Sequence, residues 1–307
     1  MKTMSEQQRK ELAALIDTYA QSEGLSKTAI PGVSLYRATR TDKIIPGLYN
    51  PALCFLAQGR KQTMLNQEIY QYGPSEYLIV SVDLPIMGQV TQASPDEPYL
   101  VIKVDISLPL LTDLLSHTEY PLRSNRKAER GIFVGRADAT LGDSVLRLAR
   151  MLATPEDIPV LATPTIREIF YRILRGEHGD KLAQVAFKGS HTERIASAIH
   201  KIKANFRESI PVEKLADLAG MSVSGFHAHF KSITAMSPLQ FQKNLRLIEA
   251  RNLMLAGDLD AATTAYQVGY ESPSQFNREY TRMFGNPPRR DIDLVKQQNL
   301  AAMQPCI

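Results

Sequence analysis

Short apolar and alternating runs fill the chain between residues 31 and 105, and turn signals separate them. The runs are rich in Val, Ile, Tyr and Leu, and the breaks include Pro46-Gly47, Gln58-Gly59 and Gly73-Pro74. Many short strands with frequent turns are typical of a sandwich or a barrel. The strands that we expect are Gly32–Ala38, Ala52–Ala57, Gln62–Leu65, Gln67–Tyr72, Glu76–Val80, Ile86–Gln92 and Tyr99–Asp105.

Apolar residues three and four positions apart predict helices before and after this β-rich region. The helices that we expect there are residues 5–22, Leu108–Leu115, Leu141–Leu152 and Thr165–Arg175. From Thr192 onward the pattern is helical throughout, so the fold class is α+β. The expected parts are a β-rich domain over residues 1–125, a helical connection over 126–190 and an all-α domain over 191–307.

The helical third contains an internal repeat of about 50 residues. Each copy has a short helix that ends at a glycine, followed by an amphipathic helix. Two short helices joined by a tight turn form a helix-turn-helix unit. Because the same pattern occurs twice with matching positions, a chance helical hairpin is a poor explanation for it. The copies are Val212–Ala219, Gly220 and Val223–Thr234, then Ala261–Val268, Gly269 and Pro273–Met283.

A long helix, Pro238–Ala256, is expected between the two copies. At 1.5 Å per residue it spans roughly 28 Å. Adjacent major grooves on one face of DNA lie about 34–36 Å apart. The linker therefore has the right size to hold two recognition helices one turn of DNA apart.

Charge adds little to this picture. Residues 191–307 carry 14 Lys or Arg against 11 Asp or Glu, so most of the net charge of +4 lies there. Nucleic-acid-binding domains are often more basic than this. Charge alone therefore does not identify the partner.

Other composition features exclude several classes of protein. The two cysteines, Cys54 and Cys306, and six histidines are too few for a disulfide framework or a cysteine-based zinc site. No stretch approaches the roughly 18 apolar residues of a membrane helix, and the first ten residues lead into no apolar signal core. We expect a cytoplasmic protein without a metal or cofactor.

The motifs in the helical third resemble the AraC/XylS family of bacterial transcription regulators over about 100 residues, Glu193–Arg290. The N-terminal part also resembles the N-terminal domain of one subgroup of that family. The helical motifs are Ala219–Ser222, Phe226, Phe230-Lys231, Ser237-Pro238, Leu245-Arg246, Ala250-Arg251, Val268–Tyr280 and Phe284–Pro288; the N-terminal motifs are Pro31–Arg37, Gln58–Lys61, Tyr72–Pro74 and Val80–Pro85.

The resemblance implies a sequence-specific, DNA-binding activator or repressor with a cupin-like β-barrel that binds a small-molecule effector. It implies double-stranded promoter DNA and RNA polymerase as partners. The effector, the sign of regulation and a homodimer formed through the helical connection are left open.

The resemblance also suggests which residues of the two recognition helices contact DNA. Outward residues near their N-termini would read bases, and Arg278 is the strongest candidate because arginine grips guanine O6 and N7 with two hydrogen bonds. Many relatives have an arginine where this chain has Ala228, and Gly225 weakens that helix, so base reading by the first copy is left open. The base-contact candidates are Ser224, His227, Ala228, Ser274, Gln275, Asn277 and Arg278, and the phosphate-contact candidates are Lys231, Arg282, Arg289 and Arg290.

The barrel interior is the expected effector site. A rival interpretation is a cupin-type small-molecule enzyme with a helical interaction module. Cupin enzymes usually hold a metal with several histidines, whereas the first histidine of this chain is His117. We therefore expect no enzyme, and a domain that only dimerises stays as a further alternative. The effector-site candidates are Arg37, Tyr49, Cys54, Gln58 and Tyr77.

Overall fold

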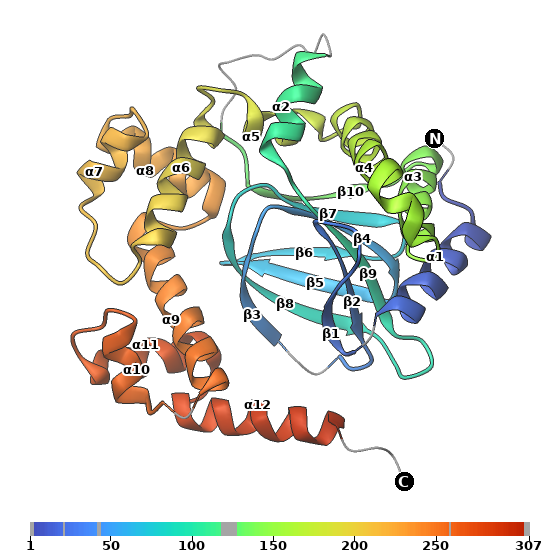
Figure 1. The fold of residues 1–307 in the computed structure, drawn as a ribbon. Helices are drawn as coiled ribbons and strands as arrows, with labels where there is room; N and C mark the ends of the chain where they lie inside the picture. The colour runs from blue at the N-terminus through green and yellow to red at the C-terminus, as the bar shows by residue number, and fades with distance from the viewer. Residues whose placement is uncertain (1–2, 21, 42–43, 118–127, 258, 304–307) are drawn as a thin grey trace.

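The computed structural model describes residues 3–20, 22–41, 44–117, 128–257 and 259–303, the backbone alone for 298–303. A β-rich domain with flanking helices lies beside an elongated helical domain, which runs along one side of it and below it (Figure 1). The helices predicted on both sides of the β-rich region are present. The α+β fold class is therefore confirmed.

The β-rich domain consists of two antiparallel sheets. In spatial order, the six-stranded sheet contains β1 (Gly24–Lys27), β2 (Val33–Ala38), β9 (Tyr99–Asp105), β4 (Ala52–Gln58), β7 (Glu76–Val80) and β10 (Ile132–Arg136). The four-stranded sheet contains β3 (Ile44–Tyr49), β8 (Leu84–Gln92), β5 (Arg60–Leu65) and β6 (Glu68–Tyr72).

The expected closed, cupin-like barrel is wrong, because the two sheets form an open sandwich. In the described part of the chain, no strand of one sheet pairs with a strand of the other. The chain changes sheet between β4 and β5 at Gly59, whose φ of 83° favours glycine, and between β6 and β7 at Gly73-Pro74. A proline has no N–H to continue a ladder. The corners therefore interrupt the hydrogen bonding that a barrel needs.

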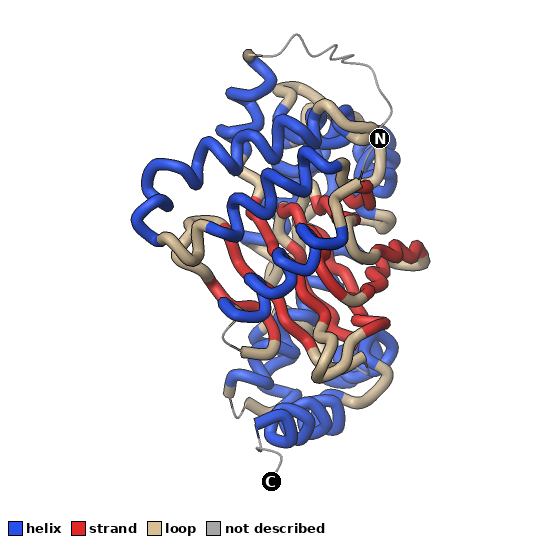
Figure 2. Tube along the Cα trace, turned by 90° about the vertical axis from the view of Figure 1, so that its right-hand side faces the viewer, coloured by secondary structure: helices blue, strands red, loops and turns tan. Residues whose placement is uncertain are grey.

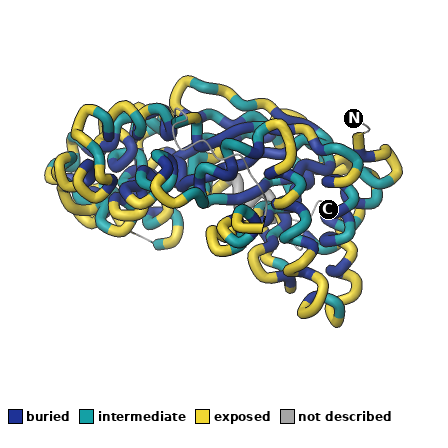
Figure 3. The backbone as a smooth tube through the Cα atoms, turned by 90° about the horizontal axis from the view of Figure 1, so that it is seen from above, coloured by how far each residue is buried: buried dark blue, intermediate teal, exposed yellow. Residues whose placement is uncertain are grey.

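Helices cover the outer face of the six-stranded sheet. These are α1 (Glu6–Tyr19), α3 (Ala139–Arg150) and α4 (Ile158–Leu174), and α2 (Leu108–Ser116) and α5 (Gly179–Ala186) lie at one end (Figures 1 and 2). Leu12, Ile16, Phe55 and Phe170 are among the fully buried side chains of this layer. Figure 3 shows buried segments, in dark blue, mainly inside the molecule and exposed segments, in yellow, mainly around its outside.

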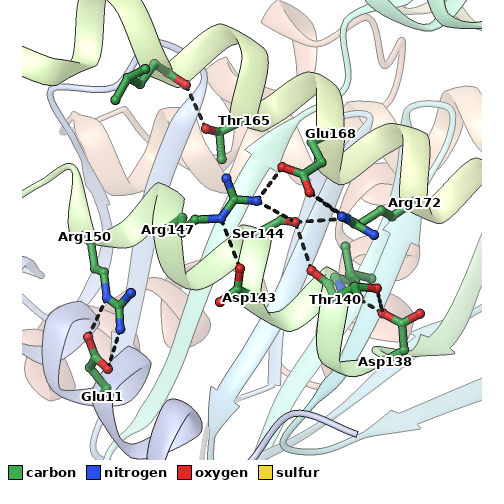
Figure 4. Close-up of polar contacts among 12 residues, drawn as sticks. Glu11, Asp138, Thr140, Asp143, Ser144, Arg147, Arg150, Thr165, Glu168 and Arg172 are labelled. Carbon is green, nitrogen blue, oxygen red and sulfur yellow. Dashed lines mark hydrogen bonds and ion pairs between the residues drawn. The ribbon is translucent and has the colours of Figure 1, made fainter. Parts of the chain in front are cut away.

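Charged side chains join helices α3 and α4 across their surface (Figure 4). Glu168 accepts from Arg147 and from Arg172, whose Nε lies 2.9 Å from Oε1. Burial opposes the charge of Glu168, but these arginines outweigh it and lower its pKa to about 2. Arg150 also pairs with Glu11 at 2.6 Å. The network fixes α1, α3 and α4 to one another.

Some helices and strands differ from those predicted from the sequence. Strand β3 contains Pro46-Gly47, which is a turn signal in sequence but is tolerated here because β3 is an edge strand. Helix α4 begins before its internal Pro164, which the pattern suggested as a boundary. Strand β10 belongs to the sheet, although it lies in the segment expected to be a helical connection.

The helical third contains both predicted helix-turn-helix units. The first is α7 (Val212–Leu218) with α8 (Val223–Thr234), and the second is α10 (Ala261–Gln267) with α11 (Pro273–Phe284). Helix α6 (His191–Ala204) precedes them, α9 (Pro238–Ala256) joins them, and α12 (Pro288–Met303) follows. The turn glycines Gly220 and Gly269 have φ values of 61° and 89°, which explains why glycine stands at both positions.

Candidate nucleic-acid interface

The first recognition helix, α8, buries one face and exposes the residues expected to meet DNA. Phe226 and Phe230 are fully buried. Ser224, His227 and Ala228 are exposed. The three candidates therefore share an accessible surface, although Ala228 brings no hydrogen-bonding group to it.

The second recognition helix, α11, has a stronger polar face. Phe276 and Tyr280 are buried, while the side chains of Ser274, Asn277 and Arg278 are exposed. Gln275 is half-buried, and its Nε2 donates to Glu279 Oε1 at 3.1 Å. The structure thus leaves Asn277 and Arg278 accessible, whereas the Gln275 amide is already engaged within the helix.

The four phosphate-contact candidates also lie on the surface. Lys231 is exposed near the end of α8, and Arg282 is exposed near the end of α11. Arg289 and Arg290 are exposed in the first turn of α12. Both recognition helices therefore carry accessible positive charge beside their polar faces.

Glu279 fixes α11 to the linker helix α9. Its carboxylate accepts from Lys243 Nζ at 2.7 Å and from Tyr270 Oη at 2.8 Å. Burial opposes its charge, but the bonds from Lys243, Gln275 and Tyr270 prevail and lower the pKa of Glu279. This carboxylate is therefore an anion at neutral pH that positions the recognition helix.

Another carboxylate, the buried Asp291, holds α12 in place. It accepts from Arg251 Nε at 2.7 Å and from Tyr280 Oη at 2.8 Å. Burial raises the pKa of Tyr280, and the bond to Asp291 raises it further. Arg251 thus joins α9 to α12, while Tyr280 joins α11 to the same carboxylate.

Arg246, in the middle of α9, connects the two helix-turn-helix units. Its Nε donates to the carbonyl of Phe206 at 2.7 Å, on the approach to α7, and its Nη1 donates to that of Gly269 at 2.7 Å, in the second turn. Nη2 also reaches the carbonyls of Arg207 and Glu208 at 3.0 and 3.2 Å. A Cβ on Gly269 would lie 2.0 Å from the Arg207 carbonyl oxygen, so glycine permits this close approach.

The positioning roles of Arg246 and Arg251 were not predicted from the sequence. Both residues appeared only as part of the family motif. The sequence feature that could have shown these roles is an arginine placed between apolar residues of one helix. The residues beside the two arginines, Leu245, Leu247 and Ala250, are buried. A charge placed there needs internal partners.

The β-rich domain holds the end of the first recognition helix. Arg130 Nη1 donates to the carbonyl of Lys231 at 2.7 Å, and Arg130 also pairs with Glu68. The N–H of Gly131 donates to the carbonyl of Ile233 at 2.9 Å. Asn66 Nδ2 donates to the carbonyl of Ala235 at 3.2 Å. Together these bonds attach the C-terminal end of α8 to the β-rich domain.

The effector-site candidates do not form one cluster. Tyr49 and Cys54 line a cavity of about 270 Å³ between the two sheets. Arg37 instead pairs with Asp17 and Glu23, at 2.8 and 2.6 Å. Gln58 Nε2 donates to the Pro98 carbonyl at 2.9 Å. Tyr77 is buried in the layer against the helices, on the other face of the sheet.

The cavity also contains a residue that the sequence analysis missed. Lys61 of β5 lines it with Tyr36, Tyr72 and Tyr99. In sequence, Lys61 follows Arg60 and resembles an exposed basic pair. Only the pairing of β5 with β8 shows that Lys61 lies within the sandwich.

The N-terminal and C-terminal parts of the chain match two different family models. Residues 29–181 match the family described as AraC-type transcriptional regulator N-terminus, and residues 215–291 match a helix-turn-helix domain family. ExsA of Pseudomonas aeruginosa, an HTH-type transcriptional regulator, is 28% identical over 165 residues, which are 52% of this chain and 57% of ExsA. The chain belongs to the AraC/XylS family.

Two further comparisons place this family member among its relatives. RhaS of Escherichia fergusonii, an HTH-type transcriptional activator, is 27% identical over 111 residues, which are 36% of this chain and 38% of RhaS. The chain thus spans about two fifths of RhaS and less than two thirds of ExsA. The crystal structure of ToxT from Vibrio cholerae O395 has the same fold, with a TM-score of 0.54 at 13% identity, over 85% of this chain and 96% of ToxT.

Helix hydropathy and the grouping of possible metal ligands describe the same residues further. None of their helices is both long and apolar enough to cross a membrane. Their side chains form no group of three or more His, Cys, Asp or Glu that could hold a metal ion.

The exposure of Arg278 and Lys231 generates a prediction about their separate roles. Arg278→Ala should cost about 1–3 kcal/mol of binding free energy on the preferred DNA site and relax selectivity at one base pair. Lys231→Ala should weaken preferred and random DNA alike, because a phosphate contact carries no base information. Fluorescence anisotropy on both DNAs measures the difference. Equal losses on both DNAs for both variants would contradict the assignment.

Proposed function

We propose that this AraC/XylS family member is an effector-responsive regulator that binds promoter DNA with both helix-turn-helix units. Helices α8 and α11 would enter successive major grooves and place the base-contact candidates against base edges. The observation that carries this proposal is that both helices expose their polar faces while Arg246 of α9 bonds the segment before α7 to the turn of the second unit. RNA polymerase and a second copy of the chain are the further partners that the family implies.

The same proposal divides the chain into a sensing part and a DNA-binding part. Residues 1–125 with the helical segment 126–190 would form the sensing part, since β10 completes the six-stranded sheet. Residues 191–307 would form the DNA-binding part. Ser190 would begin this part as the N-cap of α6, since its side chain accepts from the N–H of Glu193 at 3.0 Å.

We further propose that the bonds from Arg130, Gly131 and Asn66 transmit the state of the sensing part to DNA. They reach the last turn of α8, directly beyond the residues expected to read bases. Buried Asp83 makes a separate connection to α6, through Lys203 Nζ at 2.7 Å. A ligand that shifts the sheets would thereby change how α8 is held, as a population shift requires different contacts in the two states.

The DNA-binding proposal predicts a strong dependence on salt. With about six phosphate contacts, affinity should fall about a thousandfold between roughly 50 and 200 mM salt. The full chain should be titrated onto a duplex selected from a random pool, with unselected duplex as the comparison. A folded chain that shows no preference for any selected duplex would overturn the proposal.

The contact between the parts can be tested with two arginines of the same β10 region. Arg130→Met removes the bonds to α8, whereas Arg136→Met removes only a solvent-exposed pair with Glu76 at 3.2 Å. Hydrogen exchange of the backbone amides in residues 231–236 should rise several-fold in Arg130→Met, because fewer contacts hold the segment. It should stay at the wild-type rate in Arg136→Met. Equal rates in the two variants would contradict the connection.

A further inference from the structure

The cavity between the two sheets combines apolar walls with a lysine. Leu48, Val80 and Val101 supply aliphatic surface, and four tyrosines supply aromatic surface. The cavity volume of about 270 Å³ lies just below the range of roughly 300–1,000 Å³ for small-molecule sites. This volume suits a compact molecule with an apolar body.

Lys61 places a positive charge against these walls. Its Nζ donates to Tyr49 Oη at 3.2 Å and lies 5.3 and 5.7 Å from the ring centroids of Tyr36 and Tyr99. Burial opposes the charge, whereas the hydrogen bond to Tyr49 Oη and the aromatic faces of Tyr36, Tyr49 and Tyr99 stabilise the ammonium. Lys61 is therefore a cation at neutral pH.

The groups around the Lys61 ammonium are aromatic rings and a phenol, and they provide no negative charge. The described residues that line the cavity include no Asp or Glu. The other lysine of the lining, Lys103, is already paired with Asp105. A cation removed from water is costly unless an anion pairs with it. The Lys61 ammonium is thus available to a ligand, while Lys103 is engaged.

The tyrosines around Lys61 are donors rather than counter-ions. Burial raises the pKa of Tyr72 to about 12 and also raises that of Tyr36, so both phenols keep their protons at neutral pH. A protonated phenol can donate to an anionic oxygen. Burial likewise raises the pKa of the Cys54 thiol, so Cys54 lines the cavity as an uncharged group.

The backbone leaves room for the Lys61–Tyr49 pair. A Cβ on Gly88 of β8 would lie 2.6 Å from Tyr49 Oη and 2.8 Å from Lys61 Cε. The absence of a side chain at Gly88 therefore lets the ammonium and the phenol meet at one wall. Such convergence of polar groups within an apolar cavity is typical of a ligand site.

We propose that this cavity binds a small organic monoanion, a carboxylate with an apolar body, whose carboxylate pairs with Lys61 Nζ and accepts from Tyr49 Oη. The apolar body would lie against Leu48, Val80 and Val101. This inference rests on the proposed role of the β-rich domain as the sensing part, and it names the chemical class of the effector.

Hexanoate and 1-hexanol are suitable probes, because they share an apolar chain and differ in charge. Calorimetric titration of the full chain should give at least tenfold tighter binding of hexanoate than of 1-hexanol. Lys61→Met keeps a long apolar stem and removes the charge, so it should abolish this preference. Lys103→Met, the matched control at the same cavity, should retain it.

Two results would overturn the inference. One is equal affinity of the wild-type chain for hexanoate and 1-hexanol, which needs no variant and so does not depend on the folding of Lys61→Met. The other is a Lys61→Met variant, folded by circular dichroism, that keeps the wild-type preference for hexanoate.

DNA binding by the same samples separates this inference from the proposed function. A chain that binds selected DNA but not hexanoate refutes the carboxylate site and leaves the regulator proposal intact. A chain that binds hexanoate through Lys61 but has no DNA preference supports the site and refutes the regulator proposal.

Discussion

Helix α9 determines the relative position of the two helix-turn-helix units, because Arg246 bonds to the backbone on both sides of it. The hydrogen bonds to Phe206 and Gly269 fix the approach to the first unit and the turn of the second. The half-buried pair of Glu279 with Lys243 and the more deeply buried pair of Asp291 with Arg251 attach α11 and α12 to the same helix. These arginine and lysine side chains act inside the domain, where a lost partner is expensive, rather than on its DNA-facing surface.

The two recognition helices differ in what holds them. Helix α8 packs in a hydrophobic cluster that also includes residues of the sandwich such as Leu84 and Ile86, and its last carbonyls bond to the β-rich domain. Helix α11 packs in a separate cluster with α9, α10 and α12. Among the residues that the structure describes, the buried apolar side chains of the sandwich thus pack with the first unit and not with the second.

The sequence predicted the local features of the chain, but it did not predict whether distant strands pair to close a barrel. The alternation of β2, the apolar run of β4 and the glycine turns at Gly220 and Gly269 depend on neighbouring residues, so pattern alone located them. Whether two sheets close into a barrel depends on pairing between distant strands, and the barrel expectation failed there. Lys61 was missed for the same reason, since its environment comes from Tyr36, Tyr49 and Tyr99 on three other strands or their ends.

A one-residue insertion in α9 tests the fixed spacing most directly. The two hydrophobic clusters divide between Leu245 and Leu247, so an alanine inserted after Arg246 leaves the apolar contacts of each half of α9 with its own unit. It separates Lys243 from Glu279 and Arg246 from Gly269, which are the bonds that fix the spacing. It turns the second unit by about 100° and moves it by about 1.5 Å, with little loss of helix propensity. Hydroxyl-radical footprinting on the selected duplex should then lose the half bound by α11, with circular dichroism unchanged. A folded insertion variant with the wild-type affinity and a complete two-part footprint would contradict the account.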